Sequence, residues 1–352
     1  MASYRKATLA DRQQVVDMQV YEGLDYIQNV YNQHLTEWNS SAYVGEKDGK
    51  IVAFHFITLV DDGDTIISRG ARTREEYKHQ GIINGLYEYA FNDFTERYPS
   101  VSWKGGVRHV IGHVTTKPET RIVCKAPFCT MKPISPDTIL RHYGKSGRLS
   151  DYGSLQQLTK GQIHRLFTTQ EVATKLFGEY NDHVVISWMP YRTMSDTNVQ
   201  IIMEHENPTV FADIGGAGSN FDCTSASFST RVPLYAKNYP SGTHVKFDID
   251  IYSSDREMAL KHLYSQVYHQ CTQARASKGD IKIHFMVFLN CPLEREAVFD
   301  ALVSMGMKPR TNFLGGLKDP RMFGSLSPIE RAGAKEDRKD KTKASLTPTS
   351  KL

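Results

Sequence analysis

The sequence predicts an α/β protein of two similar units in tandem, each a mixed, largely antiparallel sheet flanked by helices. Three observations favour this fold class. The chain has 352 residues, which is enough for two domains of ordinary size. Its hydrophobic fraction is 40%, as in globular proteins. Both halves also show the same order of expected elements: a hairpin, a strand, a long helix, a strand and a short helix.

Composition excludes several classes of function. The 43 basic and 39 acidic residues leave a formal charge of +4, which gives no reason to expect a nucleic acid or a membrane as partner. Five cysteines without CxxC spacing argue for free thiols in a reducing compartment, and against a disulfide scaffold or zinc site. We expect no metal cofactor. No apolar run reaches membrane-spanning length, and the N-terminus lacks an apolar signal core. We therefore expect a soluble protein made in the cytosol.

Hydrophobic periodicity and turn residues define the first unit, which we expect over 1–138. The predicted elements are a pair of helices over 9–37, a hairpin over 42–60, a strand from Thr65, a long helix from Gly81, a strand over 107–114 and a short helix over 118–128.

The second unit is expected over 195–322, after connecting helices over 139–194. Its predicted elements are strands near 199–204, 208–213, 222–231 and 244–252, a long helix from the capping box at Ser254, a strand over 281–289, a helix over 293–305 and a last strand near 311–317. Residues 323–352 lack an apolar pattern, so we expect a disordered tail.

The loop before the first long helix, within 67–90, is typical of phosphate binding. The first N–H groups of a helix have no intrahelical partner, and the helix dipole adds positive charge there. Gly81 allows close backbone approach, and Lys78, His79 and Gln80 add donors. The glycine spacing of the Rossmann and Walker loops is absent. An ordinary strand–loop–helix connection is the alternative interpretation.

These six residues, Lys78 to Ile83, resemble the acetyl-CoA loop of GNAT acetyltransferases, Arg/Gln-x-x-Gly-x-Gly/Ala, with Ile83 in place of the last small residue. Three further segments, 22–38, 49–73 and 188–198, resemble the histidine N-acetyltransferase family within that superfamily.

The resemblance implies tandem GNAT units with acetyl-CoA as co-substrate in the first. It implies direct transfer of acetyl, in a ternary complex, to the α-amine of histidine or a similar amino acid. The cofactor-binding residues it implies are Arg72, Thr73, Lys78, His79, Gln80, Gly81, Ile82 and Ile83. The second unit has acidic residues over 253–258 instead of a glycine loop, so we expect it to shape the acceptor site without binding the cofactor.

Acetyl transfer needs a base for the amine and donors for the oxyanion. His109 and His113 are candidate bases, because they are an even number of residues apart on one predicted strand and so share a face. Ordinary hydrogen-bonded strand histidines are the alternative. A covalent intermediate is not required.

The acceptor pocket has three candidates. Asp25 and Tyr26 suit an amine, although Asp25 can equally cap a helix. Arg69 stands where the family often has a carboxylate and can bind an acceptor carboxylate or be a surface charge. Trp188 and Tyr191 are expected in the core or at the domain junction.

The chain ends in Ser350-Lys351-Leu352, a peroxisomal import signal if the source is eukaryotic, read by an import receptor. Two other functions stay open. One is acetylation of proteins or peptides. The other is acyl-CoA binding without catalysis, which is kept open by Ile83 and by Val123, which stands where many GNAT enzymes have a tyrosine acid.

Overall fold

The computed structural model describes residues 2–18, 24–110, 116–146, 155–180, 182–215, 221–234, 243–277, 280–310 and 321–329. His113, the predicted strand over 311–317 and the chain end with Ser350-Lys351-Leu352 lie outside these ranges. Peroxisomal import therefore stays a prediction.

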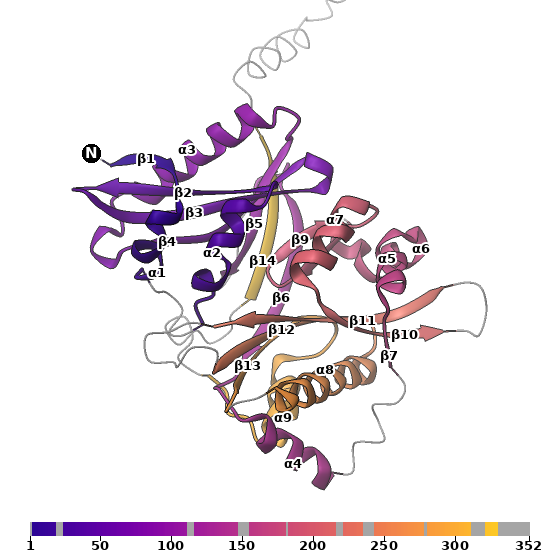
Figure 1. Cartoon of the computed structure of the whole chain (residues 1–352). Helices are drawn as coiled ribbons and strands as arrows, with labels where there is room; N and C mark the ends of the chain where they lie inside the picture. Colours follow the sequence, from indigo (N-terminus) through magenta and orange to yellow (C-terminus); the bar gives the residue numbers. More distant parts are fainter. Residues whose placement is uncertain are drawn as a thin grey trace, which may run out of the picture.

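One large sheet runs through both halves of the chain (Figure 1). Its strands, in spatial order, are β1 Ser3–Lys6, β2 Ser40–Lys47, β3 Lys50–Val60, β4 Thr65–Thr73, β5 Trp103–Val110, β14 Arg321–Pro328, β6 Arg121–Thr130, β13 Lys282–Asn290, β12 His244–Ser253, β11 Asp222–Pro233, β10 Thr209–Gly215 and β7 Gln156–Gln157. Neighbours are antiparallel except β4–β5 and β12–β13. The predicted mixed, largely antiparallel sheet is confirmed.

In the first half, helices cover both faces of β2 and β3 (Figure 1). Helix α3, Ile82–Arg97, buries Ile82, Leu86, Ala90 and Phe94 against one face. Their four-residue spacing forms the single apolar stripe that places a helix on a sheet. Helices α1, Arg12–Val16, and α2, Ile27–Thr36, cover the other face.

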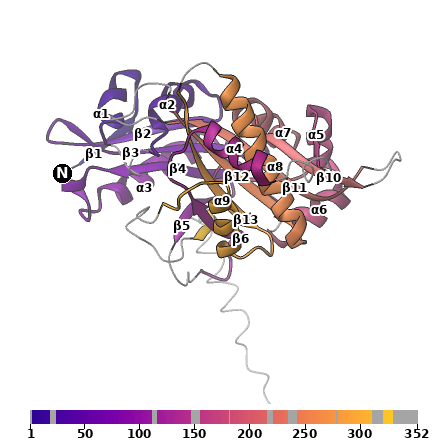
Figure 2. The ribbon, with the colours of Figure 1, turned by 90° about the horizontal axis from the view of Figure 1, so that it is seen from below.

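The second half repeats this order. Strands β10, β11 and β12 are antiparallel, and helix α8, Arg256–Ala276, leads from β12 to the parallel strand β13. Helix α8 packs across these strands with α4, Pro136–Ser146, and α9, Arg295–Ser304, beside it (Figure 2). Helices α5, Lys160–Thr168, and α6, Gln170–Phe177, cover the other face. Tandem units of one architecture are therefore present.

The two units exchange strands at their junction. Strand β14, from the end of the described chain, lies between β5 and β6, and β6 in turn pairs with β13. Gly105 is required for this insertion, because a Cβ there would lie 1.9 Å from the carbonyl oxygen of Ser325. One continuous sheet is the result.

Three predicted elements are wrong. Residues 118–128 contain strand β6 and not a helix, because a central strand buried on both faces has no alternation to distinguish it. The predicted tail begins too early, since 321–328 forms β14 with Met322, Phe323 and Leu326 buried. The strand near 199–204 is helix α7, Asp196–Ile201, followed by a π-helical turn, Ile202–Glu206, because Ser195 caps the helix by accepting from the Asn198 N–H.

A buried aspartate ties the connecting region to the first half. Asp61, in the turn between β3 and β4, accepts from the Arg192 N–H at 2.9 Å and from Asn198 Nδ2 at 2.7 Å. The Asp61 N–H donates to Asn198 Oδ1 at 2.8 Å. These bonds fix the hairpin of β8, His183–Ile186, and β9, Met189–Arg192, together with the π-helical turn, against the first sheet.

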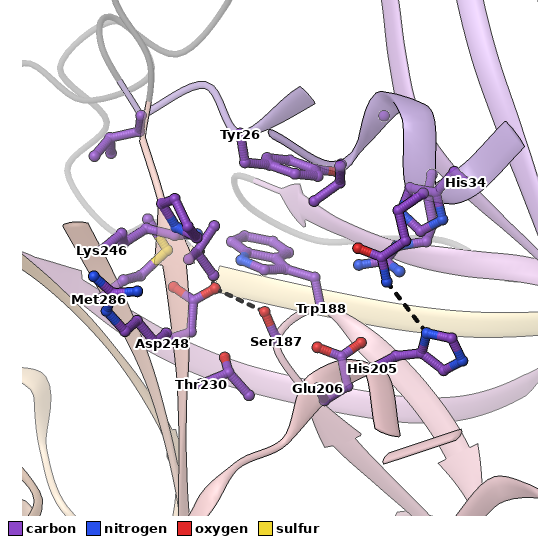
Figure 3. A pocket seen from close by; sticks show the side chains of 18 of the residues that line it. Tyr26, His34, Ser187, Trp188, His205, Glu206, Thr230, Lys246, Asp248 and Met286 are labelled. Carbon is purple, nitrogen blue, oxygen red and sulfur yellow. Dashed lines mark hydrogen bonds and ion pairs between the residues drawn. The ribbon is translucent and has the colours of Figure 1, made fainter. Parts of the chain in front are cut away.

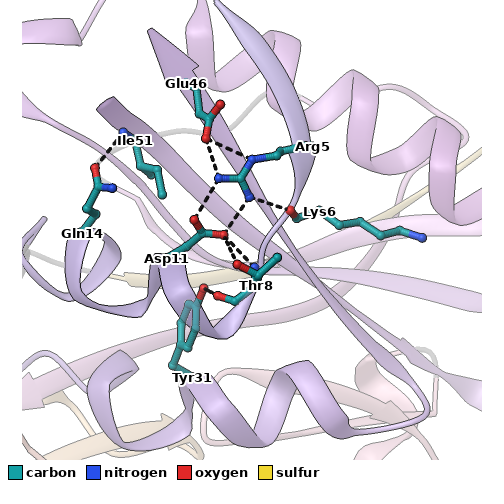
Figure 4. Close-up of polar contacts among 8 residues, drawn as sticks. All are labelled: Arg5, Lys6, Thr8, Asp11, Gln14, Tyr31, Glu46 and Ile51. Atoms are coloured by element: carbon teal, nitrogen blue, oxygen red, sulfur yellow. Dashed lines mark hydrogen bonds and ion pairs between the residues drawn. The ribbon is translucent and has the colours of Figure 1, made fainter. Parts of the chain in front are cut away.

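A polar cluster closes the opposite end of the first half (Figure 4). The Arg5 guanidinium donates to both Asp11 oxygens at 2.7 and 2.8 Å and also binds Glu46. Its hydrogen bond lowers the pKa of Asp11 to about 2, despite partial burial. The cluster holds β1 and the start of α1 on β2.

Among the described residues, none of the helices is long and apolar enough to cross a membrane. Within the same residues, no His, Cys, Asp and Glu side chains gather in a group of three that could hold a metal ion.

Candidate functional site

The strands β4 and β5 separate after a short parallel start. They pair only from Thr65↔Trp103 to Ile67↔Gly105, so the β5-facing edge of β4 from Ser68 onward has no strand partner among the described residues. A bulge follows, where Gly70 has φ +58° and a Cβ would lie 2.4 Å from Phe56 Cε1. The opening therefore offers backbone N–H groups to a ligand.

The loop that leads from this edge into α3 has the predicted form. Gly81 is the N-cap of α3 with φ +75°, a left-handed conformation that favours glycine, and His79 has φ +61°. The first-turn N–H groups of α3 point out of the helix. Lys78 pairs with Glu75, and Gln80 Oε1 accepts from Lys47 at 2.9 Å. This arrangement suits an anion such as a pyrophosphate.

The described residues of the second half form no equivalent opening. Strands β12 and β13 pair without interruption from His244↔Lys282 to Tyr252↔Asn290. The start of α8 is capped by its own Asp255, whose carboxylate accepts from the Met258 N–H at 2.7 Å. A carboxylate at that position repels phosphate, so the geometry offers a nucleotide-binding edge in the first half alone, as far as the described residues go.

A cavity of about 220 Å³ lies where the two halves meet, next to the β4 bulge (Figure 3). It is lined by Leu24, Tyr26, Val30, Gln33, His34, Ser68, Arg69, Gly70, Val107, Ser187, Trp188, His205, Glu206, Thr230, Arg231, Val232, Pro233, Lys246, Asp248 and Met286. Ser68, Arg69 and Gly70 also belong to the open edge of β4, so the cavity and the opening are continuous.

Opposite charges face each other in this cavity. Arg69 projects from β4, and Glu206 ends the π-helical turn. Burial raises the pKa of Glu206, although the charge of Arg69 and the Tyr191 hydroxyl oppose the rise. That hydroxyl donates to Glu206 Oε1 at 2.9 Å. Burial acts against the charge of Arg69, but Tyr26 and Glu206 raise its pKa above the ordinary value.

Two cavity histidines share one carboxylate. His34 Nδ1 lies 2.9 Å from Glu37 Oε2, and His205 Nδ1 lies 2.7 Å from Glu37 Oε1. Burial of Glu37 would raise its pKa, but the hydrogen bond and charge of His34 and the charge of His205 lower it to about 2. Burial lowers the pKa of His34, which stacks on Phe56 with centroids 4.3 Å apart. Burial thus opposes protonation of the His34 ring, and Nδ1 is the donor to the ionised carboxylate.

The other end of the cavity rests on β12 and on the tip of the β8–β9 hairpin. Ser187 and Trp188 form the turn with φ +51° and +70°, unusual for residues other than glycine. Asp250 Oδ2 accepts from the Ser187 N–H at 3.1 Å, and Asp248 Oδ2 accepts from Ser187 Oγ at 3.0 Å. These bonds hold the strained turn and aim the Trp188 ring along the cavity (Figure 3).

Of the three predicted substrate residues, two line the cavity and one does not. Tyr26 and Arg69 line it. Asp25 instead forms a buried pair with Arg72, at 2.8 and 3.2 Å, and caps the Ile27 N–H, outside the cavity lining. The Arg72 side chain is thus occupied, and its backbone and that of Thr73 continue the β4 edge.

Of the predicted bases, His109 lies in β5 opposite Met322, with its side chain outside the described atoms, and His113 is not described. Three further residues that line the cavity were not predicted from the sequence, namely Glu206, His34 and Asp248. A signal existed for Asp248, since charged residues alternate through the apolar strand HVKFDIDIYS over 244–253. Charges on a buried strand point to function.

Comparison with known proteins finds similar sequences over most of the chain. The family model described as histidine N-acetyltransferase, C-terminal, matches residues 152–289. Histidine N-acetyltransferase of Scomber australasicus is 22% identical over 302 residues, covering 82% of this chain and 83% of that protein. That of Oreochromis niloticus is 23% identical over 298 residues, with the same coverage of each chain. A solved tandem GNAT protein from the clavulanic acid biosynthesis pathway is 8% identical and covers 94% of this chain and 100% of its own, with a TM-score of 0.49.

The relatives match across both halves, as the resemblance of the loop and of the three segments predicts. Over most of its length the chain is therefore similar to histidine N-acetyltransferases.

Proposed function

We propose that the chain transfers acetyl from acetyl-CoA to the α-amino group of a free amino acid such as histidine. One observation carries the proposal: the junction cavity presents a guanidinium, Arg69, and a carboxylate, Glu206, to the same space. A zwitterionic amino acid carries the complementary pair, a carboxylate and an ammonium. The named relatives are histidine N-acetyltransferases.

The donor site fits the first half. The pyrophosphate would meet the α3 N-terminus and the loop formed by Lys78, His79, Gln80, Gly81, Ile82 and Ile83. The edge of β4 that leads to Arg72 and Thr73 has no strand partner among the described residues beyond Ile67, and it offers backbone N–H groups to the thioester. Bound acetyl-CoA supplies an activated acyl group there, and such N–H groups stabilise the oxyanion that develops.

In this proposal Arg69 orients the acceptor by its carboxylate, and Glu206 binds its ammonium and removes a proton. The free amine then attacks the thioester carbonyl, the tetrahedral intermediate collapses, and the C–S bond breaks. The coenzyme leaves as the thiol, because the second amine proton passes to its sulfur through bound groups or water. A carboxylate with a raised pKa is suited to accept that first proton near neutral pH. His34, oriented by Glu37 and with a pKa lowered by burial, is the second candidate base.

The test is thiol release from acetyl-CoA by the full chain with L-histidine, histamine, which lacks the carboxylate, and imidazolepropionate, which lacks the amine. We expect turnover on histidine, much weaker turnover on histamine and none on imidazolepropionate. Equal rates on histidine and histamine would contradict the role given to Arg69. Turnover on lysine- or N-terminus-bearing peptides alone would favour protein acetylation, and coenzyme A binding without turnover would favour a non-catalytic pair.

A further inference from the structure

Two neighbouring polar atoms in the cavity wall have no hydrogen-bond partner among the residues that the structure describes. Asp248 and Thr230 are directly opposite each other in the β11–β12 register, and both line the cavity. Asp248 Oδ1 and Thr230 Oγ1 are each buried without a hydrogen bond in the described part of the chain. Burying a polar atom without a partner costs free energy, so a pair of them beside a cavity indicates a ligand that supplies the partners.

The neighbouring groups limit what that ligand can be. The second oxygen of Asp248 is already occupied, since Lys246 Nζ donates to it at 2.8 Å and Ser187 Oγ at 3.0 Å. Lys246 also lines the cavity and already balances the charge of Asp248. A cationic side chain such as that of lysine would place a second positive charge beside Lys246. A neutral N–H group meets no such repulsion.

The two free atoms also differ in character. Asp248 Oδ1 can only accept a hydrogen bond, whereas the Thr230 hydroxyl can donate one. Neutral imidazole offers an N–H and a bare nitrogen separated by one ring carbon, which matches an acceptor beside a donor. Met286, opposite Asp248 on β13, and the Trp188 ring add apolar surface to the same region (Figure 3).

We propose that Asp248 and Thr230 form the subsite for the side chain of the acceptor amino acid, and that they select a neutral ring N–H beside an acceptor nitrogen, as in imidazole. The inference rests on the proposed function. Arg69 and Glu206 bind the α-carboxylate and the α-ammonium, which every amino acid has. Asp248 and Thr230 bind the side chain. Asp248 is thus a specificity-determining residue and takes no part in the proton transfer.

The experiment compares L-histidine with 3-(2-thienyl)-L-alanine, whose ring has the same size and no N–H. The full chain is assayed as wild type, Asp248→Asn and the matched control Asp213→Asn, a carboxylate on strand β10 of the same sheet that accepts from Thr224 Oγ1 and lies outside the cavity lining. The wild type is expected to favour histidine in kcat/KM by about tenfold or more, and Asp248→Asn to remove most of that preference by raising the KM for histidine. Asp213→Asn should keep the wild-type ratio.

A ratio unchanged in folded Asp248→Asn would overturn the inference while leaving the proposed function standing. Absence of turnover on every amino acid by the wild type would instead sink the proposed function. Asp248→Asn removes the counter-charge of Lys246. If that variant does not fold, the near-isosteric Thr230→Val tests the inference. It removes one hydroxyl and is expected to lower the histidine preference several-fold. A preference equal to that of the wild type would overturn the inference. The wild type is also assayed with glutamine, which carries a neutral amide, and with lysine. A preference for lysine over histidine would also overturn the inference.

Discussion

Replacing Arg69 by Gln tests how the cavity recognises its acceptor. Gln keeps a polar side chain, although a shorter one, and removes the charge. A charge-assisted hydrogen bond to a buried carboxylate contributes about 1.5–3 kcal/mol. At about 1.4 kcal/mol per factor of ten, kcat/KM for histidine should fall about 10- to 150-fold. Histamine, which has no carboxylate, should lose little, so the preference for histidine over histamine should collapse.

The same variant should also change the pH dependence. The charge of Arg69 opposes the rise in the pKa of Glu206 that burial causes. Without that charge the pKa of Glu206 rises further. A general base works when deprotonated, so activity is lost as the pH falls through its pKa. In Arg69→Gln the acidic limb of the kcat/KM profile should therefore lie at higher pH than in the wild type.

The control is Arg231→Gln. Arg231 also lines the cavity but is exposed, and exposed charges contribute little. Initial rates of thiol release across a pH series measure both effects. Equal losses on histidine and histamine in Arg69→Gln, with an unmoved acidic limb, would refute the reasoning, because Arg69 would then support the fold and not the acceptor.

Three further predictions concern the base, the junction and the N-terminal cluster. Glu206→Gln should lower kcat for histidine about 10²–10⁴-fold with a smaller change in KM, and a fully active variant would move the base role away from Glu206. Gly105→Ala should destabilise the fold by more than about 3 kcal/mol in a urea titration, since its Cβ would lie 1.9 Å from a carbonyl oxygen of β14. The control Gly144→Ala lies on helix α4, where a Cβ would meet nothing within 4 Å, and it should stabilise the fold slightly in the same titration. Asp11→Asn should cost about 1–2 kcal/mol at pH 7, because the pKa of Asp11 falls from 3.8 to about 2 on folding and solvent screens its half-exposed partner Arg5. A depressed pKa contributes stability above the unfolded value, so the difference from wild type should shrink between about pH 4 and pH 2, and a constant difference over that window would contradict the assignment.

Local features could be predicted from the sequence, and long-range pairings could not. The loop before α3 depends on Gly81, and α3 depends on four-residue apolar spacing, and both signals lie within one short segment. The exchange of β6 and β14 depends on pairs such as Gly324↔Cys124, which are far apart in the chain. No local pattern records such a pairing, and a strand buried on both faces also loses the alternation that would identify it.

The site follows the same division. Arg69 and Tyr26 could be named because they lie next to the recognisable first-half motifs. Glu206 and Asp248 come from the second half and reach the cavity only through the docking that Asp61 helps to fix. Their environment, and hence the raised pKa of Glu206, is a property of the folded junction.

The most direct test of the account identifies the product. The full chain is incubated with acetyl-CoA and L-histidine, and the mixture is analysed by mass spectrometry and NMR together with a count of released thiol. The account predicts histidine acetylated on its α-nitrogen, with one coenzyme A thiol released per product molecule. No acetylated amino acid from histidine or any other acceptor, in a preparation that still binds coenzyme A, would contradict it.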